Sequence, residues 1–132
     1  MSWGNFLYDK GFDIPVSASI TKYRAVKLTG VAEEVNIVTG DTDKAIGFPQ
    51  YSVSAAEQTR GKGASVRVMG VTQAEAAGAI AIGDVVTLAN AGDGTVSSNT
   101  TGNRIVGICV GSPSTNAGDR IALLINVFGG VA

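Results

Sequence analysis

The stretch Ala77–Thr87 constrains the fold of this chain most, because in it a run of small residues ends at a strong turn signal. It reads Ala-Gly-Ala-Ile-Ala-Ile-Gly-Asp-Val-Val-Thr. Its alanines suit a helix, but Gly78 and Gly83 would each cost about 1 kcal/mol relative to alanine inside one. Gly83-Asp84 is instead a turn pair, and the β-branched run after it has the length of a strand. The stretch therefore predicts a tight corner that leads into a buried strand.

Composition extends the β prediction to the whole chain. Its 132 residues predict one domain. Charged residues make up 16%, against about a quarter in typical globular proteins. Long surface helices need many glutamates, lysines and arginines, so this composition favours strands joined by short loops.

Turn signals divide the chain into eight or nine short strands. Asp93-Gly94 is a tight-turn dipeptide and predicts a hairpin between residues 85–88 and 95–98. Ser54 would cap a single helical turn over residues 54–58. Strands are expected at residues 14–20, 23–28, 35–38 and 71–76, among others. The predicted fold is all-β, a small single-domain barrel or sandwich, with at most one short helix.

An internal echo links two halves of the chain. Lys44-Ala45-Ile46-Gly47 is followed by a variable loop and the apolar segment 63–70, and Arg104-Ile105-Val106-Gly107 is followed by another loop and the segment 118–125. Two copies are too few for a solenoid and suit a pseudo-symmetric barrel or sandwich. The corner Ala77–Thr87 would then be the hinge between two related units, and Gly83→Val is expected to unfold the domain.

Residues 1–12 stand apart from the strand-like remainder, which gives the predicted division into an N-terminal arm (1–12) and a β-rich domain (13–132). Half of the chain's eight aromatic residues lie in this segment, namely Trp3, Phe6, Tyr8 and Phe12. They follow neither a helical nor an alternating period. Two interpretations stay open: the segment plugs its own core, or it extends to a partner as an arm with aromatic anchors.

The chain offers little material for catalysis. It has no histidine, which removes the usual general base and metal ligand. Its single cysteine, Cys109, lies in an apolar run and is expected to be a buried hydrophobe. The pair Asp41 and Asp43 lacks the further oxygen ligands of a calcium loop, and Gly61-Lys62-Gly63 lacks the spacing of a phosphate loop. We predict no enzyme activity, catalytic residue, metal or cofactor.

Charge and hydropathy exclude two classes of partner. The net charge is −1, and the ten basic residues are dispersed among eleven acidic ones. No basic cluster is dense enough to follow a nucleic-acid backbone. No apolar run approaches the roughly 20 residues of a membrane span, and the N-terminus lacks the features of a secretory signal. We therefore expect neither nucleic acid nor membrane as a partner, and synthesis in the cytoplasm.

An ordered set of segments resembles the capsid cement proteins of tailed bacteriophages, also called head decoration proteins. The set comprises a glycine-ended strand at residues 45–47, a Val-Arg-Val strand at 65–70, the Gly-Asp corner at 77–86, and an Ile-Val-Gly strand at 104–107 with Asp-Arg-Ile at 119–121. The likeness covers about two thirds of the chain, from Lys44 to Val127. It implies a β-tulip-like domain. Loops at 51–62 and 112–118 are longer than in short relatives, so no trimer-contact residue is carried over.

The resemblance implies a structural role on the virion. Such proteins bind the outer surface of an icosahedral capsid and clamp major capsid subunits together, often as homotrimers and often through an N-terminal arm. Trp3, Phe6, Tyr8 and Phe12 would then contact the capsid, and Gly78, Gly83, Asp84, Asp93 and Gly94 would form structural turns. The alternative is a carbohydrate- or host-surface-binding module on a virion, with the mid-chain aromatics Tyr23, Phe48 and Tyr51 on its rim.

Overall fold

The computed structural model describes residues 7–132, and this part of the chain is nearly all β. It contains ten strands and one short helix, in the order β1 (Tyr8–Phe12), β2 (Val26–Leu28), β3 (Val35–Ile37), β4 (Ala45–Pro49), α1 (Ala55–Thr59), β5 (Ala64–Met69), β6 (Val71–Glu75), β7 (Val85–Leu88), β8 (Val96–Ser98), β9 (Ile105–Gly111) and β10 (Arg120–Ile125). This confirms the predicted all-β fold with one short helix. Within these residues no helix is long and apolar enough to span a membrane.

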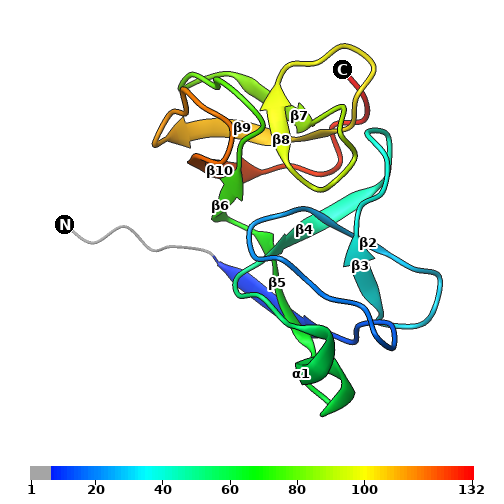
Figure 1. The fold of residues 1–132 in the computed structure, drawn as a ribbon. Coiled ribbons are helices and arrows are strands. Elements are labelled where there is room, and N and C mark those ends of the chain that lie inside the picture. The colour runs from blue at the N-terminus through cyan, green and yellow to red at the C-terminus, as the bar shows by residue number, and fades with distance from the viewer. Residues whose placement is uncertain (1–6) are drawn as a thin grey trace.

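The strands form two five-stranded antiparallel sheets with the same connectivity. The first has the order β1-β5-β4-β2-β3 and the second the order β6-β10-β9-β7-β8. Adding five to each strand number of the first sheet gives the second. We call β1–β5 with their loops the N-terminal unit and β6–β10 with theirs the C-terminal unit. Figure 1 shows the two units one above the other, joined where β5 passes into β6.

The register of the strands repeats as well. Val26 pairs with Gly47 in the N-terminal unit, and Val86 pairs with Gly107 in the C-terminal unit. Both pairs of strands have an irregularity directly after that position. The echo in the sequence therefore comes from β4 and β5 being repeated as β9 and β10, and the repeat extends to all five strands.

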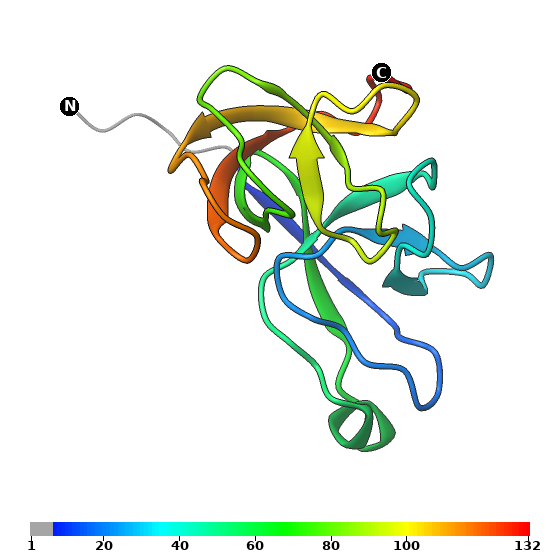
Figure 2. The same ribbon diagram turned by 45° about the horizontal axis from the view of Figure 1, so that its top comes forward.

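Each sheet curls until its two edge strands approach at one end. Asp13, after β1, forms a parallel bridge to Glu34, before β3. Ala76, after β6, forms the corresponding parallel bridge to Val96 in β8. Figure 2 shows the resulting curvature of both units, each a partly closed barrel.

The predicted helical turn and hairpin are both present. Ser54 is the N-cap of α1, and its side chain accepts a hydrogen bond from the backbone N–H of Glu57, whose own carboxylate accepts one from the backbone of Ser54. Strands β7 and β8 form the antiparallel hairpin, with Leu88 opposite Val96.

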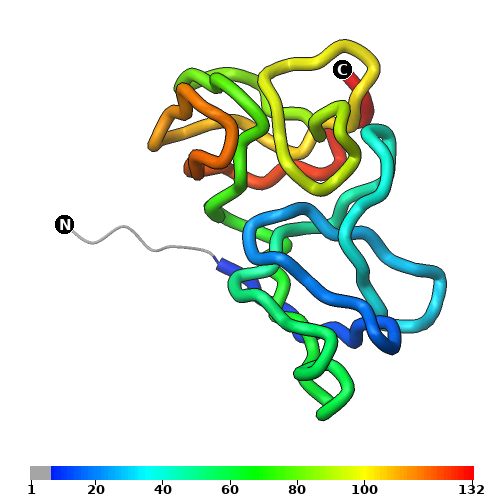
Figure 3. The backbone as a smooth tube through the Cα atoms, in the orientation of Figure 1, coloured from blue at the N-terminus to red at the C-terminus, as the bar shows by residue number. Residues whose placement is uncertain are grey.

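Two buried clusters form the core. One lies within the N-terminal unit and includes Val26, Val35 and Val66. The other fills the C-terminal unit and includes Leu88, Val106 and Leu123, but it also takes in four residues of the N-terminal unit: Ala25, Val38, Ala45 and Phe48. The two units therefore share a core and form one domain. The backbone trace in Figure 3 shows how the chain completes one unit before it begins the other.

Two expectations about the path of the chain are wrong. Residues 14–20 form no strand, because the chain turns at Ser17, whose φ is +65°, and the Ala18 backbone N–H donates to the Pro15 carbonyl oxygen at 3.0 Å. The corner Ala77–Thr87 is not the hinge between the units, since the boundary lies at Gly70, between β5 and β6. The corner belongs entirely to the C-terminal unit, where it leads from β6 into β7.

The structure places the second half of the predicted arm in a sheet. Tyr8–Phe12 forms β1, an edge strand that pairs with β5 from Met69 to Ala64. Phe12 is partly buried and packs against the N-terminal core. Trp3 and Phe6 lie outside the described residues.

Candidate binding surfaces

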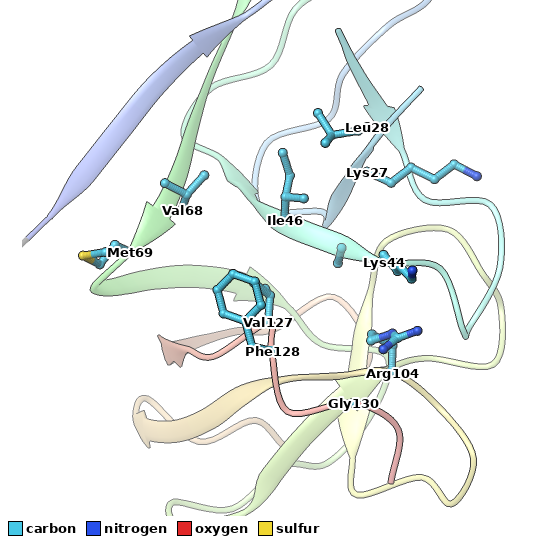
Figure 4. A pocket seen from close by; sticks show the side chains of 11 residues that line it. Lys27, Leu28, Lys44, Ile46, Val68, Met69, Arg104, Val127, Phe128 and Gly130 are labelled. Atoms are coloured by element: carbon cyan, nitrogen blue, oxygen red, sulfur yellow. The ribbon is translucent and has the colours of Figure 1, made fainter. Parts of the chain in front are cut away.

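An apolar groove of about 870 Å³ lies between the N-terminal unit and the C-terminal segment that follows β10. Its apolar lining comes from Leu28 in β2, Ile46 in β4, Val68 and Met69 in β5, and Val127 and Phe128 after β10. Figure 4 shows Ile46 and Val68 on one side of this space and the ring of Phe128 on the other. Phe128 is 95% exposed and Met69 59% exposed. Large side chains this accessible mark an interaction site more often than a scaffold position.

The basic residues Lys27, Lys44 and Arg104 stand at one end of the groove. Lys27 donates to the Asp43 carboxylate at 2.9 Å, and Arg104 donates through Nη2 to the Thr42 carbonyl oxygen at 3.1 Å. These contacts hold two of the three basic side chains against the β3–β4 turn. The groove therefore has an apolar body and a basic end.

A second apolar surface crosses the outer face of the C-terminal sheet. Leu124 in β10 pairs with both Val71 in β6 and Ile108 in β9, and Ile108 pairs with Val85 in β7. Directly paired residues point to the same face, so the four side chains form a row across four strands. Leu124 is 45% exposed, Ile108 42% and Val71 39%. With Val110, which is also exposed, this row is called the Ile108 face below.

Sequence reasoning missed both surfaces. The groove residues come from segments far apart in the chain, and no local pattern connects Leu28 with Phe128. The sequence does contain a signal for the Ile108 face, because residues 105–110 and 121–125 are continuously apolar. In a strand with one solvent-exposed face, apolar and polar residues would alternate. A continuously apolar run indicates burial on both faces, and here one face is open.

Of the predicted arm residues, only Tyr8 is an exposed aromatic in the described part of the chain. It is 54% exposed and pairs with Met69, a lining residue of the groove. Phe12 turns toward the core, and the Lys10 ammonium lies 5.0 Å from its ring centroid. Strand β1 therefore begins beside the groove.

The predicted turn residues lie in the C-terminal unit, and the carboxylate of Asp84 stabilises the turn there. Asp84 accepts hydrogen bonds from Ser98 Oγ at 2.7 Å and from the Ala81 backbone N–H at 2.9 Å. These hydrogen bonds, that of Ser98 foremost, lower the pKa of Asp84. Gly83 has a φ of +90°, whereas Gly78 has no such constraint.

Asp93-Gly94 lies in the connection between β7 and β8, residues 89–95, whose hydrogen-bonded turn is at residues 90–91, and it also contacts the N-terminal unit. The Gly94 carbonyl oxygen accepts a hydrogen bond from the Ala25 backbone N–H at 2.8 Å. A Cβ on Gly94 would lie 3.0 Å from both the backbone nitrogen and the carbonyl oxygen of Ala25. Burial opposes ionisation of Asp93, but hydrogen bonds from Thr95 outweigh it and leave the pKa of Asp93 lowered.

The aromatics considered for carbohydrate binding are dispersed. Phe48 is fully buried. Tyr23 is half-buried, with the Arg120 guanidinium 4.8 Å from its ring centroid. Tyr51 is 44% exposed, and the Lys62 ammonium lies 5.1 Å from its ring centroid. The structure does not bring the three rings together on one rim.

Several of the carboxylates accept hydrogen bonds within turns. Asp43 accepts from Lys27 and from the backbone N–H groups of Thr39 and Gly40 at 2.8 and 3.0 Å. Among residues 7–132, no three acidic, cysteine or histidine side chains gather as a metal site would require. Cys109 is a free, buried thiol.

The fold and surfaces define a small all-β protein built from two repeated five-stranded units, with two exposed apolar surfaces. A solved structure, the head fiber gp8.5 N base of bacteriophage phi29, has this fold. It superposes with a TM-score of 0.64 at 16% sequence identity, and the match covers 92% of this chain and 96% of that one. At this identity the likeness shows a shared fold. No protein-family model matches the sequence, and no curated protein sequence matches it.

Proposed function

We propose that this chain is a structural protein of a bacteriophage head, which binds the outside of the capsid and cements contacts between major capsid subunits. The observation that carries the proposal is the likeness to the phi29 head fiber base, which extends over 92% of this chain. A likeness of that extent includes both units and the way they pack. The proposal gives the chain no catalytic role, cofactor, metal, nucleic acid or membrane.

The surface of the chain supports a role in assembly. The exposed apolar groove and the Ile108 face offer area for protein contacts, whereas several carboxylates are held in turns or in ion pairs. The protein would be made in the host cytoplasm and act on the outer surface of the virion, as a homotrimer. Several weak contacts held on one assembly raise avidity by a factor of about 100 or more over a single contact.

The N-terminal segment is the proposed capsid contact, with Trp3, Phe6 and Tyr8 as its anchors. Strand β1 fixes where this segment leaves the fold, at Tyr8 beside Met69. Phe12 belongs to the core rather than to this contact, because it packs against the N-terminal cluster. A truncation that tests the contact should therefore end before β1.

The test is co-sedimentation with phage heads that lack this protein. The full chain should sediment with the heads, and a variant without residues 1–6 should bind at least about tenfold more weakly, since buried aromatic anchors each contribute more than about 1 kcal/mol at interfaces. Trp3→Ala/Phe6→Ala should reproduce this loss, and Ser2→Ala/Asn5→Ala in the same segment should not.

The truncated protein should keep the thermal midpoint of the full chain, because strand β1 is intact. Undiminished binding by the truncated form would disprove the role of the arm. Failure of the full chain to sediment with any heads would disprove the proposed function.

A further inference from the structure

The two units are held together by one face of the N-terminal unit, called the Phe48 face here and formed by Ala25, Val38, Ala45 and Phe48. All four side chains are at most 3% exposed. They belong to the buried cluster of the C-terminal unit, together with Leu88 and Val106. The Phe48 face thus closes the C-terminal core from outside that unit.

Hydrogen bonds surround this contact. The Arg104 backbone N–H donates to the Asp41 carbonyl oxygen at 2.8 Å, and the Glu75 backbone N–H donates to the Tyr23 carbonyl oxygen at 2.9 Å. Arg24 Nη2 also lies 2.9 Å from Glu75 Oε2. The contact between the units is therefore a specific interface, with an apolar centre and a polar rim.

The internal repeat gives the Phe48 face a counterpart. Phe48 pairs with Arg67 in β5, and Ile108 pairs with Leu124 in β10, at the same position of the repeat. Phe48 is fully buried, whereas Ile108 is 42% exposed. The Ile108 face carries no charged side chain, so burying it would desolvate no charge.

The repeat also gives a counterpart to the surface that receives the Phe48 face. Leu88 and Val106 lie in the core that this face closes, and they are at most 1% exposed. The equivalent residues of the N-terminal unit are Leu28 and Ile46. Leu28 pairs with Val35, as Leu88 pairs with Val96. Leu28 is 53% exposed, and both Leu28 and Ile46 line the groove. In the N-terminal unit the Phe48 face is covered and the groove is open. In the C-terminal unit the surface at Leu88 and Val106 is covered and the Ile108 face is open.

We propose that the Ile108 face of one copy packs into the groove of a second copy, which repeats between chains the contact made within each chain. Because two different surfaces meet, the contact is heterologous, and it closes into a ring when the rotation between copies allows. This inference rests on the self-association in the proposed function and identifies its interface. The homotrimer would be such a ring.

The test measures self-association by sedimentation velocity over a range of protein concentrations. Ile108→Asp places a charge on the Ile108 face, and Leu28→Asp places a charge in the groove. Each variant alone should be monomeric at concentrations where the wild type associates. Val31→Asp is the matched control, because Val31 is 61% exposed and belongs to neither surface. It should associate as the wild type does.

Mixing the two variants distinguishes the heterologous contact from a symmetric one. Ile108→Asp keeps an intact groove and Leu28→Asp keeps an intact Ile108 face, so an equimolar mixture should form a one-to-one dimer that grows no further. In a second measurement, Ile108→Cys mixed with Leu28→Cys should give a disulfide-linked dimer under oxidation. Each cysteine variant alone should give little dimer, since Cys109 is buried.

A wild-type protein that stays monomeric at all concentrations would overturn the inference, as would a mixture that remains monomeric. Circular dichroism and the thermal midpoint check that both Asp variants are folded, as their exposed positions predict. Sedimentation with phage heads separates this inference from the proposed function. Wild type that associates through these surfaces but ignores heads would disprove head binding alone. A monomeric wild type that binds heads would disprove this interface and the homotrimer, and would leave head binding standing.

Discussion

Gly47 and Gly107 occupy the same position in the two units, and at both positions the backbone of the neighbouring strand leaves no room for a side chain. A Cβ on Gly47 would collide with the carbonyl oxygen of Arg67, and a Cβ on Gly107 would collide with that of Leu124. Both obstacles are backbone atoms of a paired strand, which cannot move without disturbing the sheet. The close approach of β4 to β5 is thus repeated between β9 and β10.

Gly107→Ala should lower the free energy of unfolding by about 2 to 3 kcal/mol, the usual cost of forcing an atom into a packed interior. Gly47→Ala should have a similar effect. Gly78→Ala is the control, because a Cβ there meets no atom within 4 Å and its φ is ordinary. Urea unfolding measures all three variants. Equal midpoints for Gly107→Ala and Gly78→Ala would contradict the close approach.

Gly83→Val should destabilise the domain by about 2 kcal/mol and leave it folded, a smaller effect than the unfolding expected from the sequence. Gly83 has a φ of +90°, a strained region for valine, but a Cβ there meets no atom within 4 Å. Its counterpart is Tyr23, whose φ is +65°. Both donate to the matching strand, Tyr23 to the Pro49 carbonyl oxygen at 2.9 Å and Gly83 to that of Cys109 at 2.8 Å.

Gly83→Asn should cost less than Gly83→Val, because asparagine tolerates this backbone region better than a β-branched residue does. Thermal unfolding followed by circular dichroism compares the two variants. A Gly83→Val protein without a cooperative unfolding transition would show that the corner depends on more than its backbone angle.

The pair Tyr23 and Gly83 also shows why the sequence revealed only part of the repeat. The segments around Gly47 and Gly107 share residue types because the close approach of strands demands glycine there. The turn at position 23 or 83 demands only a backbone angle, which tyrosine and glycine satisfy in different ways. The repeated structure is therefore complete, whereas the sequence analysis recognised the repeat only in the segments that form β4, β5, β9 and β10.

The binding surfaces were harder to predict than the fold. The alternation and turn signals that predict strands are local, and they led to the all-β fold and the 85–98 hairpin. Whether Leu28 is buried like Leu88 depends on what packs against the end of each unit. The order in which the two units are joined decides this difference in burial. It leaves the Leu88 end of the C-terminal unit covered and the Leu28 end of the N-terminal unit open.

Asp43→Asn should lower stability at neutral pH by about 1 to 2 kcal/mol, because a charged acceptor of four hydrogen bonds is replaced by a neutral one. The hydrogen bond from Lys27 lowers the pKa of Asp43 from the ordinary 3.8 to about 2, assisted by the Thr39 and Gly40 backbone N–H groups. A lowered folded-state pKa stabilises the protein above the ordinary pKa, and this contribution disappears as the pH falls through the folded-state value.

The stability difference between wild type and Asp43→Asn should therefore close as the pH falls from about 4 to about 2. Urea unfolding at a series of pH values measures it. Asp41→Asn removes the same charge two residues earlier in this turn and should cost less than about 0.5 kcal/mol. A difference that stays constant down to pH 2 would show that the Lys27 contact does not depend on the charge of Asp43.

Phe48→Ala and Ile108→Ala compare equivalent positions of the two units. Phe48 is fully buried and belongs to the core that both units share, so its truncation should cost about 3 to 5 kcal/mol. Ile108 is 42% exposed, so Ile108→Ala should cost less than about 1 kcal/mol in the isolated chain. Unfolding is measured at a concentration below self-association, since association adds its own stabilisation.

Because the Phe48 face joins the two units, its truncation should also lower the cooperativity of unfolding, seen as a smaller m-value or a second transition. If Phe48→Ala cost no more than Ile108→Ala, the shared core would not be what holds the two units together.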